Sequence, residues 1–178
     1  CGIVYGLDSN FFLERRVAPR LQILGLQSYL EYYHYLRYDA NGSKELDTLT
    51  ERITTHETYL FRELYQLECF RYEILPDIYH RKQESKTIRI WSAGCSTGEE
   101  VYTLAILLRE DARFDNWDVQ VFGSDISRKV LATSRQAQYS SSSFRATENY
   151  FKRKYFHETE GKQQVNDDIR AICSFGQL

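Results

Sequence analysis

The chain has 178 residues, of which 42% are apolar and 27% are charged, a balance typical of a soluble globular protein with one or two domains. Its formal net charge of -2 gives no general electrostatic reason to bind DNA or RNA. No apolar run approaches the ~20 residues that a membrane-spanning helix needs. The first residues do not resemble a signal peptide either, so we expect a cytoplasmic protein without membrane insertion.

The four cysteines are widely separated and form no C-x-x-C pair, which favours reduced thiols and argues against a zinc site. They are Cys1, Cys69, Cys95 and Cys173. The chain begins without methionine and stops at Leu178, where the pattern is typical of the middle of a strand. We therefore expect a fragment of a longer protein.

The first part of the chain has helical patterning. Apolar residues recur at a spacing near 3.6 between residues 10 and 38, where Pro19 is expected to kink or split the run. Ser28 is placed to cap a second helix. A third short helix is expected over Lys44–Arg52. The pattern predicts a helical domain over residues 1–52.

Residues 53–178 carry a different pattern. It predicts helix over 61–79, interrupted at Pro76, and then strand 88–93, loop 94–98, helix 99–110, strand 118–125 and a helix from Ser127 to about Tyr139. Alternating strands and helices of this kind predict a parallel sheet with right-handed crossovers. The serine run after Tyr139 is expected to be a mobile polar loop, and the last ~20 residues have only weak strand patterning.

The loop from Gly94 to Gly98 follows the first predicted strand, where open α/β sheets bind ligands. Its glycines would let a ligand approach the backbone closely. No lysine follows Gly98, which argues against a phosphate-binding loop. The carboxylates of Glu99 and Glu100 would repel a pyrophosphate but suit a ligand with positive charge. Alternatively, both glutamates only offset the dipole of the helix that they begin.

Asp125 ends the second predicted strand. An acidic side chain at this position can accept hydrogen bonds from ribose hydroxyls. The alternative is that Asp125 caps the following helix. Nearer the N-terminus, His56-Glu57 begins like the zinc motif H-E-x-x-H, but Leu60 replaces the second histidine. That segment is then best interpreted as a helix start capped by Thr58.

Several motifs resemble those of the bacterial chemoreceptor glutamate methyltransferases, the CheR-type family. Ile90–Glu100 is similar to the family's first nucleotide-binding motif, and Phe122–Ile126 to its acidic second-strand motif. Residues 53–63 resemble a signature of threonine, asparagine, threonine, aromatic residues and arginine. Further matches keep the family's order at Asp8–Arg16, Leu24–Leu30, Arg135–Tyr139, Lys154–Phe156 and Ile169–Phe175. These matches, in the family's order and over nearly the whole chain, carry the resemblance.

The resemblance implies an α/β fold, with a small N-terminal helical unit followed by an incomplete Rossmann-like methyltransferase domain over residues 53–178. It also implies the start of a small antiparallel β-subdomain from about Tyr155. S-adenosylmethionine would bind residues that match family positions, with the ribose at Asp125 and the methionine carboxylate at Arg62. The implied contacts are His56, Thr58, Arg62, Glu100 and Asp125.

Two departures from the family pattern lie near these positions. His56 replaces a usual asparagine, and Val101 replaces a common proline. The family's later cofactor and substrate motifs would follow Leu178, which puts catalysis by this fragment alone in question.

The implied acceptors are glutamates on the helices of methyl-accepting chemotaxis receptors. A basic surface would suit such acidic helices, and the N-terminal unit offers Arg15, Arg16 and Arg20. A second basic stretch comprises Arg128, Lys129, Arg135, Arg145, Lys152, Arg153 and Lys154. Charged helical residues usually face solvent without binding a partner. Two other functions remain open: a related methyltransferase with another acceptor, and a signalling module that keeps the fold without turnover.

Overall fold

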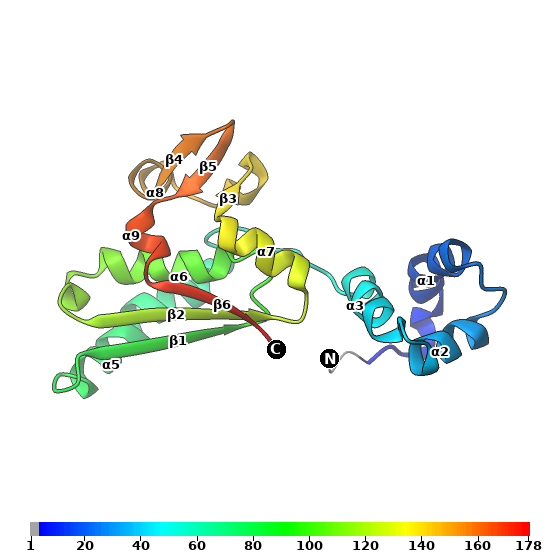
Figure 1. Ribbon diagram of the computed structural model, residues 1–178. Helices are drawn as coiled ribbons and strands as arrows, with labels where there is room; N and C mark the ends of the chain where they lie inside the picture. The colour runs from blue at the N-terminus through cyan, green and yellow to red at the C-terminus, as the bar shows by residue number, and fades with distance from the viewer. Residues whose placement is uncertain (1–3) are drawn as a thin grey trace. The chain divides into compact units, whose positions relative to one another are not determined.

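The computed structural model describes residues 4–178, so Cys1 lies outside the described part of the chain. Contacts between residues divide the chain into two compact units, Cys1–Thr55 and His56–Leu178 (Figure 1). This division lies close to the expected boundary at residue 53. Within residues 4–178, no helix is long and apolar enough to cross a membrane.

The first unit is helical. Pro19 lies inside one continuous helix, which ends where Gly25 adopts a left-handed φ of 69°. The Ser28 side chain accepts a hydrogen bond from the Glu31 backbone N–H at 3.1 Å, which confirms the predicted cap. The helices are α1 (Asn10–Leu24), α2 (Tyr29–Tyr38) and α3 (Gly42–Ile53), preceded by a 3-10 turn, η1 (Leu7–Ser9).

A buried polar cluster joins these helices. The Arg20 guanidinium of α1 donates to both carboxylate oxygens of Glu45 on α3, at 2.8 and 2.5 Å. The Tyr32 hydroxyl of α2 donates to the same carboxylate at 2.7 Å. Burial alone would raise the pKa of Glu45, but the hydrogen bonds from Arg20 and Tyr32 outweigh it and the pKa is lowered. The ionised Glu45 carboxylate therefore connects all three helices of this unit.

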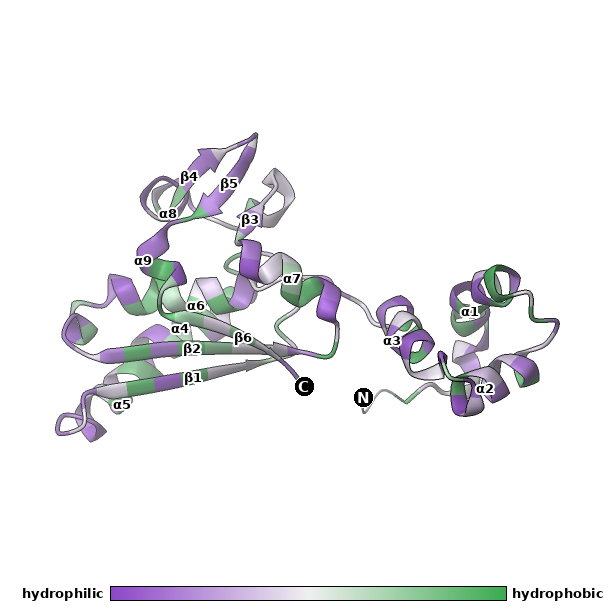
Figure 2. Ribbon diagram, viewed as in Figure 1, coloured by the Kyte–Doolittle hydropathy of each residue, from purple (hydrophilic) through white to green (hydrophobic). Residues whose placement is uncertain are grey.

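The second unit contains a parallel sheet in the order β1-β2-β6. Its register pairs Ile90 with Val121 and Gly123 with Phe175. Helix α6 connects β1 to β2 and buries most of its residues, and Figure 2 shows the apolar stretches of α6, β1 and β2 in green. The elements are β1 (Thr87–Ala93), α6 (Glu99–Glu110), η3 (Ala112–Phe114), β2 (Asp118–Asp125), α7 (Arg128–Gln136) and β6 (Cys173–Gln177). The predicted parallel sheet is confirmed.

The helical segment before the sheet differs from the prediction. It begins at Leu64 instead of 61, because Phe61 and Glu63 adopt left-handed φ values of 58° and 59°. A π-helical turn interrupts it directly before α5, and Pro76 occupies the first turn of α5. The elements are α4 (Leu64–Cys69), η2 (Phe70–Ile74) and α5 (Leu75–Arg81).

The later part of the second unit forms a small antiparallel sheet in the order β3-β5-β4, as expected for the region after Tyr155. The expectation of weak strands missed two helices, and β6 pairs with β2 of the parallel sheet instead. The elements are β3 (Gln138–Tyr139), η4 (Ser141–Phe144), α8 (Asn149–Tyr155), β4 (Phe156–Thr159), β5 (Lys162–Val165) and α9 (Asp167–Arg170).

Two predictions near the serine run were wrong. Helix α7 ends at Gln136, before the expected Tyr139, because Ala137 turns the chain with a φ of 56°. The serines form a 3-10 turn instead of a mobile loop. Ser143 explains this order, since its carbonyl accepts from the Leu60 N–H at 2.9 Å and its hydroxyl donates to Glu99 at 3.0 Å.

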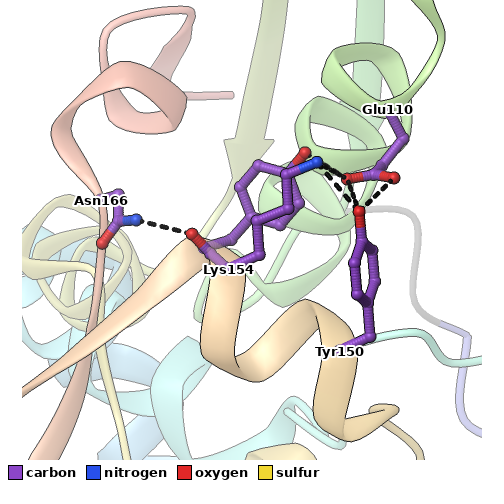
Figure 3. Close-up of polar contacts among 5 residues, drawn as sticks. Glu110, Tyr150, Lys154 and Asn166 are labelled. Atoms are coloured by element: carbon purple, nitrogen blue, oxygen red, sulfur yellow. Dashed lines mark hydrogen bonds and ion pairs between the residues drawn. The ribbon is translucent and has the colours of Figure 1, made fainter.

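A second polar cluster ties the antiparallel subdomain to the end of α6 (Figure 3). The Glu110 carboxylate accepts from Tyr155 at 2.5 Å, from Lys154 at 2.8 Å and from Tyr150 at 3.2 Å. Asn166 also donates to the Lys154 carbonyl at 3.0 Å. Burial opposes ionisation of Glu110, but the hydrogen bonds from Lys154 and Tyr155 prevail and the pKa is lowered. Glu110 therefore anchors α8 as an ionised carboxylate.

Candidate functional site

The candidate site lies at the carboxyl ends of β1 and β2. The N–H groups of Gly94 and Cys95 donate to the Ser124 carbonyl at 2.8 and 2.9 Å, which ties the loop after β1 to the end of β2. Asp125 fixes the same loop from the side, because one of its carboxylate oxygens accepts from the Ser96 N–H at 2.9 Å. Residues from the ends of two neighbouring strands are thereby brought together.

Asp125 is not the cap of the following helix. Ser127 has that role, since its hydroxyl accepts from the Val130 N–H at 3.2 Å. The second oxygen of Asp125 accepts from the Ser127 N–H at 2.9 Å. A carboxylate has about four acceptor positions. Backbone donors therefore orient the Asp125 carboxylate, and each of its oxygens keeps a further acceptor position.

The two loop glycines differ in their surroundings. A side-chain carbon added at Gly94, whose φ is 77°, would meet nothing within 4 Å. One added at Gly98 would lie 2.8 Å from Ser134 and 3.2 Å from the Phe175 ring. Gly98 therefore serves the packing of α6 against α7 and β6, and only Gly94 leaves open space for a ligand. Close approach of a ligand to the backbone therefore stays a prediction for Gly94, whereas neighbouring side chains already fill the space beside Gly98.

The two glutamates at the start of α6 also differ. Glu99 is 3% exposed and accepts hydrogen bonds from Thr97 at 2.6 Å and Ser143 at 3.0 Å. Glu100 is exposed and accepts from the Ser92 hydroxyl at 2.7 Å, near the end of β1. Glu99 is occupied by structural contacts, so Glu100 is the glutamate available to a positively charged ligand.

Residues 55–63, which we call the cofactor segment, contain the other predicted contacts. Residues 55–59 have no regular secondary structure, so the expected helix start at Thr58 is wrong. The Ser96 hydroxyl donates to the His56 carbonyl at 3.4 Å, which joins the segment to the loop after β1. Arg62 donates to the Glu57 carbonyl at 2.7 Å and is 43% exposed.

Ser96 is therefore the junction of the site, because its N–H binds Asp125 and its hydroxyl binds the backbone of His56. No sequence signal distinguishes Ser96, because a serine within a glycine loop has no distinctive spacing. The thiol of neighbouring Cys95 is buried, and this burial, with a further contribution from Asp125, raises its pKa to about 12, which disfavours the nucleophilic thiolate.

The arginines expected to dock a substrate lie in the helical unit. Arg20 is 14% exposed and held by Glu45, so it does not present a free cation to a partner. The other two arginines are exposed. Arg15 lies over the ring of Phe11 and Arg16 over the ring of Phe12, with guanidinium carbons 5.7 and 5.1 Å from the ring centroids. These four side chains and Arg52 line a hollow of about 440 Å³.

In the second basic stretch, Arg145 forms an ion pair with Glu57, and Lys154 forms one with Glu110.

Comparison with known families assigns both units. Residues 56–178 match the model of the CheR methyltransferase S-adenosylmethionine-binding domain. The chain belongs to the CheR methyltransferase family. Residues 1–54 match that family's all-alpha domain. The CheR assignment confirms the resemblance expected from the motifs, and it makes the α/β unit the cofactor-binding domain, with S-adenosylmethionine as its cofactor.

Relatives of this CheR chain include named chemotaxis methyltransferases. Over 178 residues it is 35% identical to chemotaxis protein methyltransferase 2 of Vibrio cholerae, and the aligned region covers 99% of this chain and 61% of the relative. Identity to the chemotaxis protein methyltransferase of Borreliella burgdorferi is 32%, over 99% of this chain and 64% of the relative. Identity to the chemotaxis protein methyltransferase of Salmonella typhimurium is 30%, over 99% of this chain and 60% of the relative. The chain thus spans less than two thirds of these relatives.

Proposed function

We propose that the protein transfers a methyl group from S-adenosylmethionine to glutamate side chains of chemotaxis receptors, forming methyl esters. The observation that carries the proposal is the convergence at Ser96 of Asp125 from β2 and His56 from the cofactor segment. This junction lies at the carboxyl edge of a parallel sheet, in a domain that matches the family's cofactor-binding model. The protein would act in the cytoplasm on the glutamate-rich receptor helices.

We assign the cofactor contacts to His56, Thr58, Arg62, Glu100 and Asp125. Asp125 would accept hydrogen bonds from the ribose through the positions that Ser96 and Ser127 leave free. Glu100 would face positive charge on the methionine part, and the planar Arg62 guanidinium would hold its carboxylate. These residues bind and orient; none of them has to form a covalent bond.

The chemistry requires orientation more than acid–base catalysis. S-adenosylmethionine would supply a methyl group bound to a positively charged sulfur. A C–O bond to the glutamate carboxylate would replace the C–S bond, with S-adenosylhomocysteine as the neutral leaving group. A glutamate side chain with a pKa of about 4.3 is already ionised at neutral pH, so no general base is needed. The neutral Cys95 thiol agrees with a site that lacks its own nucleophile. The chain therefore contributes alignment and exclusion of water.

The test of cofactor binding is calorimetry with S-adenosylmethionine on the intact protein. Asp125→Ala should weaken binding by ~2–4 kcal/mol, because two hydrogen bonds to a charged group are lost.

Arg62 is tested by turnover, measured as transfer of the methyl label. Arg62→Lys should lower turnover sharply if the guanidinium holds two oxygens at once. The matched control is Asp118→Ala, an exposed acid at the opposite end of the same strand as Asp125, which should leave both binding and turnover unchanged.

The acceptor is tested with methyl-labelled cofactor and receptor. Base-labile label on receptor glutamates would support the proposal. Label on another acceptor would favour a related methyltransferase, and cofactor binding without transfer would favour a signalling module; either result would overturn the receptor assignment.

We further propose that acidic receptor helices dock at Arg15 and Arg16, beside the hollow that Phe11, Phe12 and Arg52 complete. The double variant Arg15→Glu/Arg16→Glu should raise the apparent KM for receptor and leave cofactor affinity unchanged. The effect should shrink with added salt, because the Debye length is only ~8 Å at physiological ionic strength.

The control for docking is Arg37→Glu/Lys44→Glu, which reverses the same number of exposed charges elsewhere in the helical unit. If both double variants give superimposable salt curves, the effect comes from net charge and not from this surface.

A further inference from the structure

Arg145 contacts the cofactor segment from a distant part of the sequence. It follows η4, and its Nη2 lies 3.0 Å from a carboxylate oxygen of Glu57. Its guanidinium carbon lies 3.8 Å from the centroid of the Tyr59 ring. Thr58, one of the assigned cofactor contacts, lies between these two partners. Arg145 therefore holds the residues on both sides of Thr58.

The backbone that carries Arg145 is itself well anchored. The carbonyl of Ser143 accepts from the Leu60 N–H at 2.9 Å, and its hydroxyl donates to buried Glu99 at 3.0 Å. The next residue, Phe144, is buried with its ring centroid 4.9 Å from that of Phe156 in β4. Helix α6 and the small sheet thus fix the base of the Arg145 side chain.

Arg62 holds the same two residues as Arg145. Its Nη1 donates to the Glu57 carbonyl at 2.7 Å, and its guanidinium carbon lies 5.8 Å from the centroid of the Tyr59 ring. Glu57 and Tyr59 therefore connect Arg145 to Arg62. A shift of Glu57 would move the hydrogen bond that orients the Arg62 guanidinium.

The contacts of Arg145 should add little to the free energy of unfolding of the whole unit. The Arg145 and Glu57 side chains are 48% and 71% exposed, and exposed ion pairs add little to folding. Residues 55–59 have no regular secondary structure of their own, so side-chain contacts decide how they are held. The effect of Arg145 is local to the cofactor segment.

We infer that Arg145 is a positioning residue for the cofactor site, which holds Glu57 and Tyr59 so that Thr58 and Arg62 keep their orientation toward S-adenosylmethionine. The identity of the ligand rests on the proposed function. The contacts by which Arg145 holds Glu57 and Tyr59 do not depend on that identity, so the structural inference and the proposed function can be refuted independently.

The first measurement is amide hydrogen exchange of Glu57, Thr58 and Tyr59 without cofactor. Arg145→Gln should speed exchange about three- to tenfold, as expected from losing an ion pair and a cation–π contact. The matched control is Arg81→Gln, which removes an exposed arginine paired with Asp77 at the end of α5. The control should leave this segment unchanged, and both variants should have similar Tm values.

The second measurement is S-adenosylmethionine affinity by calorimetry on the intact protein. Arg145→Gln should weaken binding roughly tenfold, comparable to one lost hydrogen bond to a charged group. Arg145→Lys should recover part of the affinity, since it keeps the charge near Glu57 but loses the planar stack on Tyr59. Because Arg145 acts partly through Glu57, Arg145→Gln/Glu57→Gln should bind no more weakly than Arg145→Gln.

Unchanged exchange in Arg145→Gln would overturn the inference, whatever the cofactor does. Additive losses of affinity in the double variant would also overturn it, because they would mean that Arg145 acts independently of Glu57. A parent protein that binds no S-adenosylmethionine would refute the proposed function and the cofactor role of Arg145, whereas the exchange result would still report the hold on the segment.

Discussion

The two units use the same polar chemistry at different depths. In the helical unit, Glu45 binds a cation and a tyrosine hydroxyl and is 5% exposed. In the α/β unit, Glu110 binds a cation and tyrosine hydroxyls, but its side chain is 15% exposed and its Lys154 partner 49% exposed. The pKa of each carboxylate is lowered although burial alone would raise it. The burial of each carboxylate, and not the kind of partner it binds, should determine how much its cluster contributes to the free energy of unfolding.

The largest effect is expected where the ion pair is deepest. Arg20→Met would leave the Glu45 carboxylate buried without its cation, which typically costs about 3–5 kcal/mol. The helical unit should then unfold at much lower denaturant, as followed by circular dichroism. Arg20→Met/Glu45→Leu should recover much of the loss, because no buried charge remains. Equal stability of parent and Arg20→Met would mean that water reaches Glu45 freely.

A smaller effect is expected at the second cluster. Glu110→Ala removes the common acceptor of Tyr150, Lys154 and Tyr155, and should cost about 1–3 kcal/mol, mainly through the partly buried Tyr155 hydroxyl. Amide exchange in β4 and β5 should accelerate more than in β1 and β2. Lys154→Met should have a weaker effect in the same direction, because Lys154 is largely solvated. A uniform change across the whole unit would contradict the anchoring role of Glu110.

The smallest effect should appear as a dependence on pH. A carboxylate whose folded pKa is lowered stabilises the fold above its unfolded pKa, and this stabilisation is lost as pH falls through the folded pKa. Both units should therefore lose stability in acid, beginning below a pH of about 4.3, the unfolded pKa of glutamate. Glu45→Gln should flatten the acid slope of the helical unit, and Glu110→Gln that of the α/β unit. If either slope survives its substitution, another carboxylate is responsible.

The features predicted correctly from sequence depend on local signals. The parallel strands follow from runs of β-branched and apolar residues, and the Ser28 cap from a serine before an apolar helix. The place of the loop after β1 follows from Gly94 at the end of a strand. The position of Asp125 at the end of the neighbouring strand follows in the same way, and its contact with the cofactor stays a prediction.

The features missed depend on contacts between distant residues. Arg20 had the spacing of a surface arginine, yet Glu45 turns it inward. Likewise, no sequence pattern distinguishes Phe61 and Glu63 as left-handed positions that delay a helix.

Short-range spacing was enough to predict the parallel strands with their connecting helices, the family, and the place of the loop after β1. Only the tertiary structure decided which polar groups meet: Ser96 with Asp125 and the His56 backbone, and Arg145 with Glu57 and Tyr59. These partners come from different elements. Their pairing depends on how helices and strands pack, which no local pattern records.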